Sequence, residues 1–486
     1  MAYKLRSYQE ECVKSISSYI NSDRNDPVLI VGPVGCGKSL LIAEAARLMG
    51  DKTLVLQPSK ELLQQNHDKI TSYGIPATIY SASCGKKELS NMIYATLGSI
   101  KKVVGQLKEM GIRNVLIDEA HAGYGPEDGS EFMTFMNELK PKKVIGFTAT
   151  PCRLKTMSIG QVSYSQLNFI TRMRPVYFKN LIHVIQVEEM IRQGFWTPLK
   201  YEIWDFNGDA LKLNSNGSEY TAESISEAVR KNGLNNLILR RLMVLKDVCR
   251  SILVFMDSVE SCNTAAEWMN AKICAGMAEV VHGGTPKKQR EAIVEGFKSG
   301  KTKVVFNYSA LGTGFDHPGL DCVIVGKPTF SFSSFYQWLG RAVRIKDGKG
   351  SALVVDCCNN SSRFGDIRKL SIENYKGYGW GMFIGDKLIT NIPMGDKVTK
   401  TDLDIKAAKK DRRRGLAQGV TAAPVPGRPD HPLGSTVMTF GKYCGWMLHS
   451  IPVSYFKFIN ETFDWDNDRN KDIKEYIDFL IKNNRL

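Results

Sequence analysis

The chain has 486 residues, a formal net charge of +15 at neutral pH and 43% apolar residues. This length and apolar content predict about three domains, and the positive charge favours a polyanionic partner. No stretch approaches the about 18 apolar residues of a membrane span, and the N-terminus lacks a signal-peptide pattern, so we expect no membrane partner. The 11 cysteines are scattered without a C-x-x-C pair. We therefore expect a cytoplasmic protein in a reducing compartment, without structural zinc.

Strand and helix patterns alternate in the first part of the chain. Apolar, strand-like runs occupy residues 28–31, 53–56, 77–80, 115–117 and 143–147. Polar or amphipathic segments such as 60–73 and 99–110 lie between them. This alternation is typical of helices that cross over a doubly wound parallel sheet, so the predicted fold class is α/β.

The segment GPVGCGKS at residues 32–39 follows the first of these strands and precedes a helical pattern at 40–49. Glycines such as Gly35 and Gly37 let backbone N–H groups and a helix N-terminus point at one anion. Lys38 can then reach the β- and γ-phosphates of a nucleoside triphosphate, and Ser39 can hold Mg²⁺. The predicted cofactors are ATP and Mg²⁺.

A second motif, DEAH at residues 118–121, follows the apolar strand at 115–117. A carboxylate at a strand end can coordinate Mg²⁺ directly or through water, and the next carboxylate can orient and deprotonate an attacking water. We therefore assign Asp118 to the metal and Glu119 to general base catalysis.

A second α/β lobe is predicted further along the chain. Residues 152 to about 200 are basic and predicted to be irregular, apart from a short helix that ends at Gly194. Strand-like runs then occupy 251–255, 303–306, 322–325 and 352–355, with a helix at 261–270. Two arginines follow Gln337 in the segment QWLGRAVR at 337–344. Arg341 and Arg344 are three residues apart, so on one helix face they can reach a γ-phosphate across a cleft.

The chain changes character after Asp356. Residues 375–384 are rich in glycine and aromatic side chains, and 397–425 combine a basic run with a Pro/Gly/Ala segment. We predict a helix that frays into a flexible linker. Residues 433–486 regain aromatic and periodic character, which predicts a small independent α+β module.

The order of these motifs resembles that of superfamily 2 DEAH-type helicases and translocases, which have two RecA-like lobes, and the likeness covers roughly residues 3–358. LRSYQ at 5–9 resembles an adenine-reading Q-type motif, which places Arg6 and Gln9 at the nucleotide. Motifs Ia, Ib, III, IV and V are matched by 57–62, 95–99, 148–151, 254–256 and 311–316. The resemblance implies a set of further roles: nucleic-acid contacts for Pro58, Ser59, Thr96, Gly98, Ser99 and Thr313, nucleotide contacts for Gly314 and Asp316, a catalytic role for Gln337, and coupling of the two sites for Thr148 and Thr150.

Within the superfamily, the residues at 5–9, HGG at 282–284 and TGFD at 313–316 resemble the RadD type, and phage UvsW-type branch-migration helicases are the next resemblance. The chain departs from the RadD pattern after the second lobe, where it has only Cys357 and Cys358 in place of a cysteine cluster.

The last module has its own resemblance. MTFGKYCGW at 438–446 is similar to a small module with a Met-Pro-Phe-Gly-Lys-Tyr-x-Gly signature that recurs beside nucleic-acid enzymes. Lys442, Tyr443 and Tyr455 offer a charge and stacking faces to nucleic acid. Phe440 and Trp446 are expected in the module's core, because so small a fold needs its large side chains.

The predicted domains are an ATP-binding lobe at 1–198, a second RecA-like lobe at 199–358, an extension and basic linker at 359–430, and the C-terminal module at 431–486. The predicted function is that of a monomeric ATP-dependent DNA helicase or translocase, acting on single-stranded or branched DNA in recombination, repair or replication. The C-terminal module is a candidate site for a protein partner.

Two alternatives stay open. One is an RNA helicase, which is weakened because the chain has QWLGR at 337–341 where RNA-handling DEAD-box enzymes have HRIGR. The other is a nucleic-acid-stimulated ATPase that remodels complexes without unwinding. The sequence feature that would support this alternative is the lack of a recognisable hairpin that could act as a wedge between strands.

Overall fold

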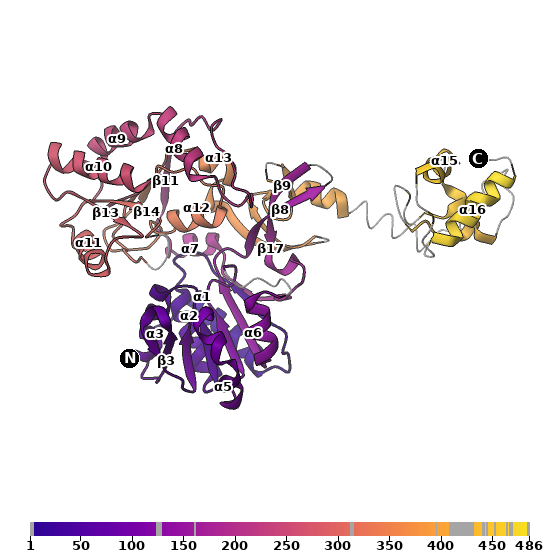
Figure 1. Cartoon of the computed structure of the whole chain (residues 1–486), viewed down its shortest axis with the longest axis horizontal. Helices are drawn as coiled ribbons and strands as arrows, with labels where there is room; N and C mark the ends of the chain where they lie inside the picture. Colours follow the sequence, from indigo (N-terminus) through magenta and orange to yellow (C-terminus); the bar gives the residue numbers. More distant parts are fainter. Residues whose placement is uncertain are drawn as a thin grey trace. The chain divides into compact units, whose positions relative to one another are not determined.

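In the computed structural model the chain forms two compact units, one of Met1–Tyr375 with Gly379–Val398 and one of Lys376–Tyr378 with Thr399–Leu486 (Figure 1). The structure describes residues 4–122, 129–159, 162–311, 315–376, 378–394, 396–407, 432–439, 443, 446–451, 453–462, 465 and 470–483. Several sequence predictions lie outside the described residues: those for Thr313, Gly314, Phe440, Lys442 and the part of the basic run from Lys409 to Arg414.

The first sheet of the large unit has eight strands in the order β10-β1-β7-β6-β2-β5-β3-β4. All neighbours pair in parallel except β3 and β4. The strands are β1 (Val28–Val31), β2 (Thr53–Leu56), β3 (Thr78–Ser81), β4 (Lys86–Lys87), β5 (Met92–Ala95), β6 (Asn114–Ile117), β7 (Lys143–Thr148) and β10 (Asn180–Val184). The doubly wound parallel sheet is confirmed, although the sequence prediction missed β4, β5 and β10.

Helices cover both faces of this first sheet. Ile30 and Val55 share a core with the helices on one face, whereas Leu29 and Leu54 pack with the helices on the other. Strands buried on both faces read as unbroken apolar runs, which is why they could be found in the sequence. The helices of this lobe are α1 (Ser7–Asn21), α2 (Lys38–Met49), α3 (Lys60–Thr71), α4 (Leu97–Ile100), α5 (Val104–Glu109) and α6 (Glu131–Leu139).

The second sheet is fully parallel, in the order β11-β16-β15-β12-β14-β13. Its strands are β11 (Leu199–Ile203), β12 (Ile252–Phe255), β13 (Ala278–His282), β14 (Val304–Tyr308), β15 (Cys322–Val325) and β16 (Ala352–Asp356). Around it lie α8 (Ala222–Lys231), α9 (Leu234–Val248), α10 (Val259–Lys272), α11 (Lys287–Ser299), α12 (Phe332–Leu339) and α13 (Asn360–Phe364). The connection from the first lobe contains α7 (Val187–Arg192), close to the short helix that was predicted.

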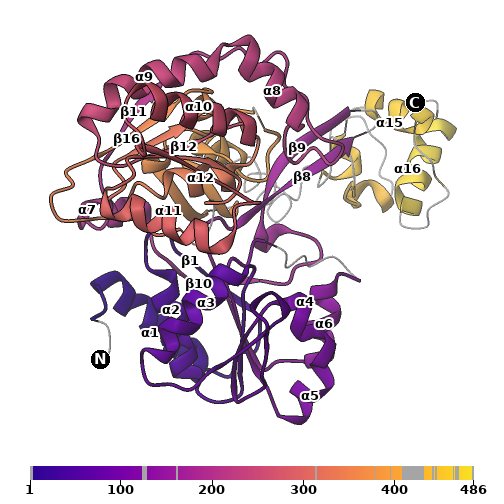
Figure 2. The same cartoon turned by 60° about the vertical axis from the view of Figure 1, so that its left-hand side comes forward.

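The segment predicted to be irregular instead begins with a long β-hairpin. β8 (Cys152–Ile159) pairs with β9 (Val162–Phe169) in an unbroken antiparallel register, and Figure 2 shows the two strands side by side. The prediction failed because the apolar residues change from even to odd positions partway along each strand, between Leu154 and Met157 and between Tyr164 and Leu167, so neither strand has the regular alternation that marks a half-buried strand.

Although its sequence lies between β7 and β10 of the first sheet, the hairpin is anchored on segments that come later in the chain. Thr156 Oγ1 donates a hydrogen bond to Asn216 O at 2.8 Å, and Ser165 Oγ donates to Gly217 O at 3.1 Å. The backbone N–H of Asn391 donates to Leu167 O at 2.7 Å. The glycine is required at 217, where a Cβ would lie 2.1 Å from Thr156 Oγ1.

A small antiparallel sheet follows the second lobe, with β17 (Leu370–Tyr375), β18 (Gly379–Ile384), β19 (Lys387–Leu388) and β20 (Val398–Thr399) in that order. Residues 400–407 are helical, as the beginning of the predicted helix requires, and the linker that was expected after them lies outside the described residues.

In the small unit, α15 (Val453–Thr462) and α16 (Lys471–Lys482) enclose a core that includes Met438 and Phe456. An isolated β-bridge joins Val437 and Met447. The expectation that Trp446 belongs to the core was wrong, because 41% of this side chain is exposed.

Candidate active site

The phosphate and metal motifs meet because the strands that precede them are neighbours. β1 leads into the glycine-rich turn, β6 into Asp118, and β7 into Thr148, and these three strands lie side by side in the order β1-β7-β6. Carboxyl ends of neighbouring parallel strands share one edge of a sheet, which is where ligands bind in open α/β folds.

The glycine-rich turn has the backbone that an anion site requires. Gly35 and Gly37 both have positive φ, at 80° and 82°. Gly37 is the N-cap of α2, and a Cβ there would lie 2.6 Å from Gln9 Nε2. Both positions therefore need glycine, and the first turn of α2 presents its N–H groups, Lys38 and Ser39 to the same space.

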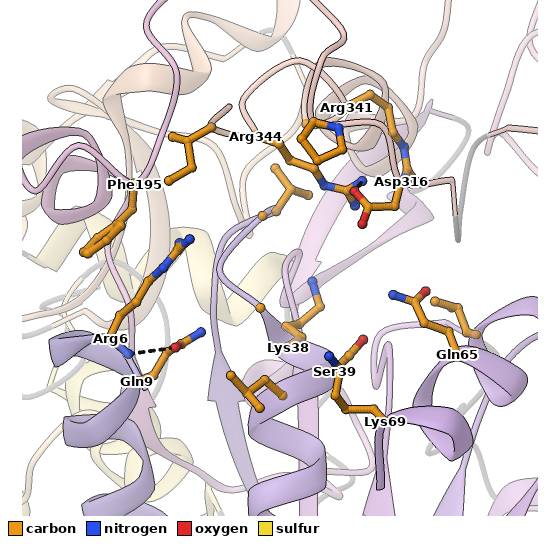
Figure 3. Close-up of a pocket in the computed structure, with 18 of the residues that line it drawn as sticks. Arg6, Gln9, Lys38, Ser39, Gln65, Lys69, Phe195, Asp316, Arg341 and Arg344 are labelled. Atoms are coloured by element: carbon orange, nitrogen blue, oxygen red, sulfur yellow. Dashed lines mark hydrogen bonds and ion pairs between the residues drawn. The ribbon is translucent and has the colours of Figure 1, made fainter. Parts of the chain in front are cut away.

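A cavity of about 470 Å³ opens at this edge and is lined by both lobes. Figure 3 shows Lys38 and Ser39 on one wall, with Arg341, Arg344 and Asp316 opposite them. Most of the predicted nucleotide and catalytic residues among the described ones line this cavity: Arg6, Gln9, Gly35, Gly37, Lys38, Ser39, Asp118, Glu119, Asp316, Gln337, Arg341 and Arg344.

Charge is concentrated where the lobes meet. Lys38 Nζ lies 3.6 Å from Glu119 Oε1. Burial disfavours the charged form of both groups, but the attraction between the two charges is larger than this effect. The pKa of Lys38 is therefore raised, chiefly by Glu119, and the pKa of Glu119 is lowered, chiefly by Lys38. Burial, and then the Glu119 carboxylate, raise the pKa of Asp118 to about 7. The site therefore holds a carboxylate base beside a carboxyl group that a bound cation would help to ionise.

Asn66, which the sequence prediction missed, holds the metal-site carboxylate in place. Its Nδ2 donates to Asp118 Oδ2 at 2.9 Å, and both side chains are buried. The backbone N–H of Glu119 donates to the other oxygen, Asp118 Oδ1, at 2.8 Å. The signal for Asn66 was its position on the amphipathic segment 60–73, but only the packing of α3 against the β6 edge brings it to Asp118.

The two arginines of the second lobe reach the cavity from a turn. α12 ends at Leu339 with Gly340 as its C-cap, so the prediction that Arg341 and Arg344 share a helix face was wrong. A Cβ at Gly340 would lie 2.5 Å from Val34 Cγ2, which shows how closely this turn packs on the glycine-rich turn of the first lobe.

Main-chain acceptors hold the guanidinium groups. Arg341 Nη1 donates to Phe315 O at 2.7 Å, and Arg344 Nη1 donates to the same oxygen at 3.1 Å and forms an ion pair with Asp316. Burial, and then the charge of Arg344, lower the pKa of Arg341 to about 9. Arg341 is buried and Arg344 is partly exposed, and two adjacent cations that line the cavity are suited to receive an anion.

One end of the cavity carries aromatic and polar side chains that are suited to bind the nucleobase of ATP. The Arg6 guanidinium lies 4.5 Å from the centre of the Phe195 ring. Gln9 Oε1 accepts a hydrogen bond from the Arg6 N–H at 3.0 Å, and Gln9 Nε2 donates to Cys36 O at 2.9 Å. Phe195 was not predicted, and nothing in the local sequence distinguishes it.

The chain between the lobes is also tied into the site. Trp196 Nε1 donates to Val34 O at 2.8 Å, and Thr197 Oγ1 donates to Arg344 O at 2.7 Å. One short segment thus contacts both the glycine-rich turn and the arginine turn.

The candidate nucleic-acid residues of the first lobe lie further along the same sheet edge. Pro58 and Ser59 follow β2, and Thr96, Gly98 and Ser99 follow β5, the neighbour of β2. Ser59 caps α3 by accepting from Leu62 N at 3.3 Å. Pro58 and Gly98 are exposed. These segments form one surface beside the cavity.

The candidate coupling residues Thr148 and Thr150 are fully buried between the lobes. Thr148 Oγ1 lies 2.8 Å from His121 Nδ1, and Thr150 Oγ1 lies 3.1 Å from Ser333 Oγ in α12. At the root of the hairpin, Arg153 Nε donates to His121 O at 2.5 Å. The end of β7 therefore connects the DEAH segment, the hairpin and the second lobe.

The donor set fits a nucleotide with its metal. Mg²⁺ prefers hard oxygen ligands, and the Ser39 hydroxyl and the Asp118 carboxylate supply them at the first turn of α2 and the end of β6. When bound, Mg²⁺ neutralises phosphate charge. Glu119 Oε2 is buried and accepts no hydrogen bond within the described part of the chain, so it is available to a water molecule.

Two tandem parallel sheets with a phosphate site, a DEAH segment and opposing arginines are similar to the domains of ATP-hydrolysing helicases. Residues 2–153 match the family described as type III restriction enzyme, res subunit, and residues 235–346 match the helicase conserved C-terminal domain.

Individual relatives agree with this class. The chain is 24% identical to a 51.5 kDa protein of a Lactococcus phage (isolate 7-9), over 68% of this chain and 65% of that protein. It is 22% identical to the putative ATP-dependent helicase Irc3 of Saccharomyces cerevisiae, over 74% of this chain and 52% of that protein. The chain thus spans about half to two thirds of the length of these curated relatives.

Among solved structures, the ATP-dependent type ISP restriction-modification enzyme LlaBIII bound to DNA is similar with a TM-score of 0.55 and 16% identity, over 74% of this chain and 28% of that one. This likeness shows the fold. Within the described residues, no helix has the length and apolar content needed to cross a membrane.

Proposed function

We propose that this protein is an ATP-driven DNA helicase or translocase. The observation that carries the proposal is the division of one cavity between two lobes, with Lys38 and Glu119 on one side and Arg341 and Arg344 on the other. A triphosphate that engages both sides would draw the lobes together, and its hydrolysis would release them. Each cycle would then shift the lobes along a strand.

In this proposal the cavity residues have separate roles. Lys38 and the glycine-rich turn around Gly35 and Gly37 bind the phosphates, Ser39 and Asp118 hold Mg²⁺, and Glu119 activates water. Gln337, Arg341 and Arg344 complete the site from the second lobe. Arg6, Gln9 and Asp316 contact the nucleoside, with Gly314 assigned by resemblance alone.

The nucleic-acid surface is proposed to be the edge formed after β2 and β5. Pro58, Ser59, Thr96, Gly98 and Ser99 lie there, and Thr313 is assigned by resemblance. Contacts to phosphates would hold the backbone without reading its sequence. The net charge of +15 supports a polyanionic partner.

Three observations favour DNA. The similar LlaBIII enzyme is bound to DNA in its solved structure. The residues at 5–9, 282–284 and 313–316 resemble the RadD type, with the UvsW type next, which points to branched or single-stranded DNA in recombination, repair or replication. The segment QWLGR departs from the RNA-handling pattern. An RNA helicase is the alternative.

The hairpin β8–β9 bears on the second alternative, a remodelling ATPase without unwinding. That reading rested on the lack of a hairpin, and an eight-residue pair of strands now begins two residues after Thr150. A two-stranded element that follows the coupling residue Thr150 directly in the chain is a candidate for dividing a duplex, so we favour unwinding.

We further propose the domain limits 1–198, 199–358, 359–430 and 431–486. The last of these, with its Met-Pro-Phe-Gly-Lys-Tyr-x-Gly resemblance, would help select a DNA structure or a protein partner, and the working form would be a cytoplasmic monomer. Tyr443 and Trp446 pack edge to face with their centroids 5.4 Å apart, which supports an aromatic contact surface on this module.

The experiment is a comparison of polymers. ATP hydrolysis by the full chain is measured alone and with single-stranded, duplex, forked and four-way DNA and with RNA of matched sequence, beside single-turnover unwinding of the fork. Stimulation by DNA and unwinding of the fork are expected. Stimulation by RNA alone would replace the DNA proposal with the RNA alternative, and stimulation by DNA without unwinding would leave a translocase or remodelling enzyme.

A further inference from the structure

A group of hydroxyl and imidazole side chains from both lobes lies next to Glu119, the proposed general base. His121 Nε2 lies 3.1 Å from Ser333 Oγ, and Ser333 Oγ also lies 3.1 Å from Thr150 Oγ1. The other nitrogen, His121 Nδ1, lies 2.8 Å from Thr148 Oγ1. Ser333 belongs to α12 of the second lobe, whereas the other three residues belong to the first.

The imidazole also borders Glu119. His121 Nδ1 is 3.4 Å from Glu119 Oε2, the oxygen available to water. Both ring nitrogens therefore have a partner, and a ring held at both nitrogens has one orientation. Because a neutral imidazole offers one donor and one acceptor, a hydroxyl that can both donate and accept is suited to hold either tautomer. Burial, opposed by Glu119, lowers the pKa of His121, which agrees with a neutral ring.

Ser333 is placed for this contact and is not needed to begin its helix. The N-cap of α12 is Ser331, whose side chain accepts from Ser334 N. Ser333 lies one helical turn before Gln337, and residues four apart share a helix face. Gln337 lines the nucleotide cavity, so the same face of α12 presents one side chain to the cavity and one to His121.

We infer that Ser333 is a positioning residue that makes hydrolysis depend on docking of the second lobe. With the lobes docked, its hydroxyl contacts His121 and Thr150 and fixes the imidazole, whose Nδ1 lies 3.4 Å from Glu119 Oε2 and so limits the positions that this carboxylate can take beside the water. When the lobes separate, the hydroxyl is withdrawn and the base loses this support. The inference rests on the proposed ATP-driven cycle and adds a residue, outside the family motifs, through which the second lobe acts on the base.

The test uses the full chain and three variants. Ser333→Ala removes the hydroxyl, and Ser333→Thr keeps it. Ser334→Ala is the control, since the Ser334 hydroxyl donates to Ser331 Oγ within the same lobe. For each, kcat and KM for ATP are measured with forked DNA, together with the thermal midpoint. Ser333→Ala is expected to lower the DNA-stimulated kcat about tenfold, with KM and the midpoint nearly unchanged. Ser333→Thr should recover most of the rate, and Ser334→Ala should match the parent.

A double-variant cycle with His121→Ala separates positioning from a merely structural effect. If Ser333 acts through His121, the combined variant is no slower than His121→Ala alone. The inference is overturned if Ser333→Ala keeps the parent rate or if the two effects multiply. If the parent shows no stimulation by DNA or RNA, the proposed function itself fails. If nucleic acid stimulates ATP hydrolysis by the parent and by Ser333→Ala equally, the proposed function stands and only the role of Ser333 is rejected.

Discussion

The two lobes contribute unequal chemistry to one cavity. The first supplies groups already tied together, with Asp118 held by Asn66 and Glu119 paired with Lys38. The second supplies Arg341 and Arg344, which rest on a single main-chain oxygen and a neighbouring carboxylate. The difference indicates that the first lobe is built to bind a nucleotide and the second to act on it once the lobes meet. Variants should therefore separate binding from hydrolysis according to the lobe they affect.

The largest effects are expected at the first lobe's charged pair. Lys38→Ala should weaken ATP binding and lower hydrolysis about 1,000-fold, because a cation on the β- and γ-phosphates is lost. Glu119→Gln should lower hydrolysis by about 100-fold or more and leave ATP affinity nearly unchanged, because only the base is removed. Equilibrium binding and single-turnover hydrolysis measure the two quantities, with the exposed Lys14→Ala as a control. Hydrolysis by Glu119→Gln at the parent rate would show that another group is the base.

Asn66→Ala should act on the metal rather than on the nucleotide. Losing the hydrogen bond to Asp118 leaves the carboxylate less well oriented, so the Mg²⁺ concentration for half-maximal hydrolysis should rise about tenfold. Gln64→Ala, on the exposed side of α3, is the control. An unchanged Mg²⁺ dependence would mean that Asn66 only fills space between α3 and β6.

A smaller effect tests whether the hairpin moves with the second lobe. Gly217→Ala places a Cβ 2.1 Å from Thr156 Oγ1 and should loosen the anchor of β8–β9. Unwinding of a forked DNA should fall about fivefold while ATP hydrolysis stays within about twofold, as expected for roughly 1 kcal/mol at one contact. Gly276→Ala is a matched control, because it also has positive φ but no atom within 4 Å. Equal loss of both activities would tie the hairpin to catalysis instead.

The smallest effect is expected from removing residues 396–486. Basal hydrolysis should change little, because the cavity residues precede this segment. DNA affinity should fall, and the slope of log affinity against log salt should flatten by about 0.9 for each lost phosphate contact on duplex DNA. Binding titrations at several salt concentrations measure both. Unchanged affinity and an unchanged preference for forked over single-stranded DNA would assign the tail to protein docking or folding.

The part of this account that could be predicted from sequence is the part encoded locally. Buried parallel strands are apolar throughout, and the residues that follow them, such as Lys38 and Asp118, gather at one edge whatever the distant packing. The hairpin β8–β9 was missed because the alternation of polar and apolar residues changes phase partway along each of its strands. The arginine turn was predicted as a helix because nothing local shows that Gly340 must pack on Val34.

Contacts between the lobes were beyond prediction for a different reason. The approach of Ser333 to His121 and of Gly340 to Val34 depends on how two separately folded sheets dock. The hydrophobic periodicity of one segment carries no information about the surface of the segment that it will contact. Asn66 could be predicted in part, since its helix was expected from the sequence but its hydrogen bond to Asp118 was not.

The most direct test of the division between the lobes is a paired measurement on Arg344→Ala and Arg341→Ala. For each variant and the parent, ATP affinity and single-turnover hydrolysis are determined with forked DNA, with the exposed Arg230→Ala as a control. The account predicts that hydrolysis falls about 100-fold or more, as for other arginines that stabilise phosphoryl transfer, while affinity stays within about threefold. Hydrolysis at the parent rate, or a loss of affinity as large as the loss of hydrolysis, would contradict it.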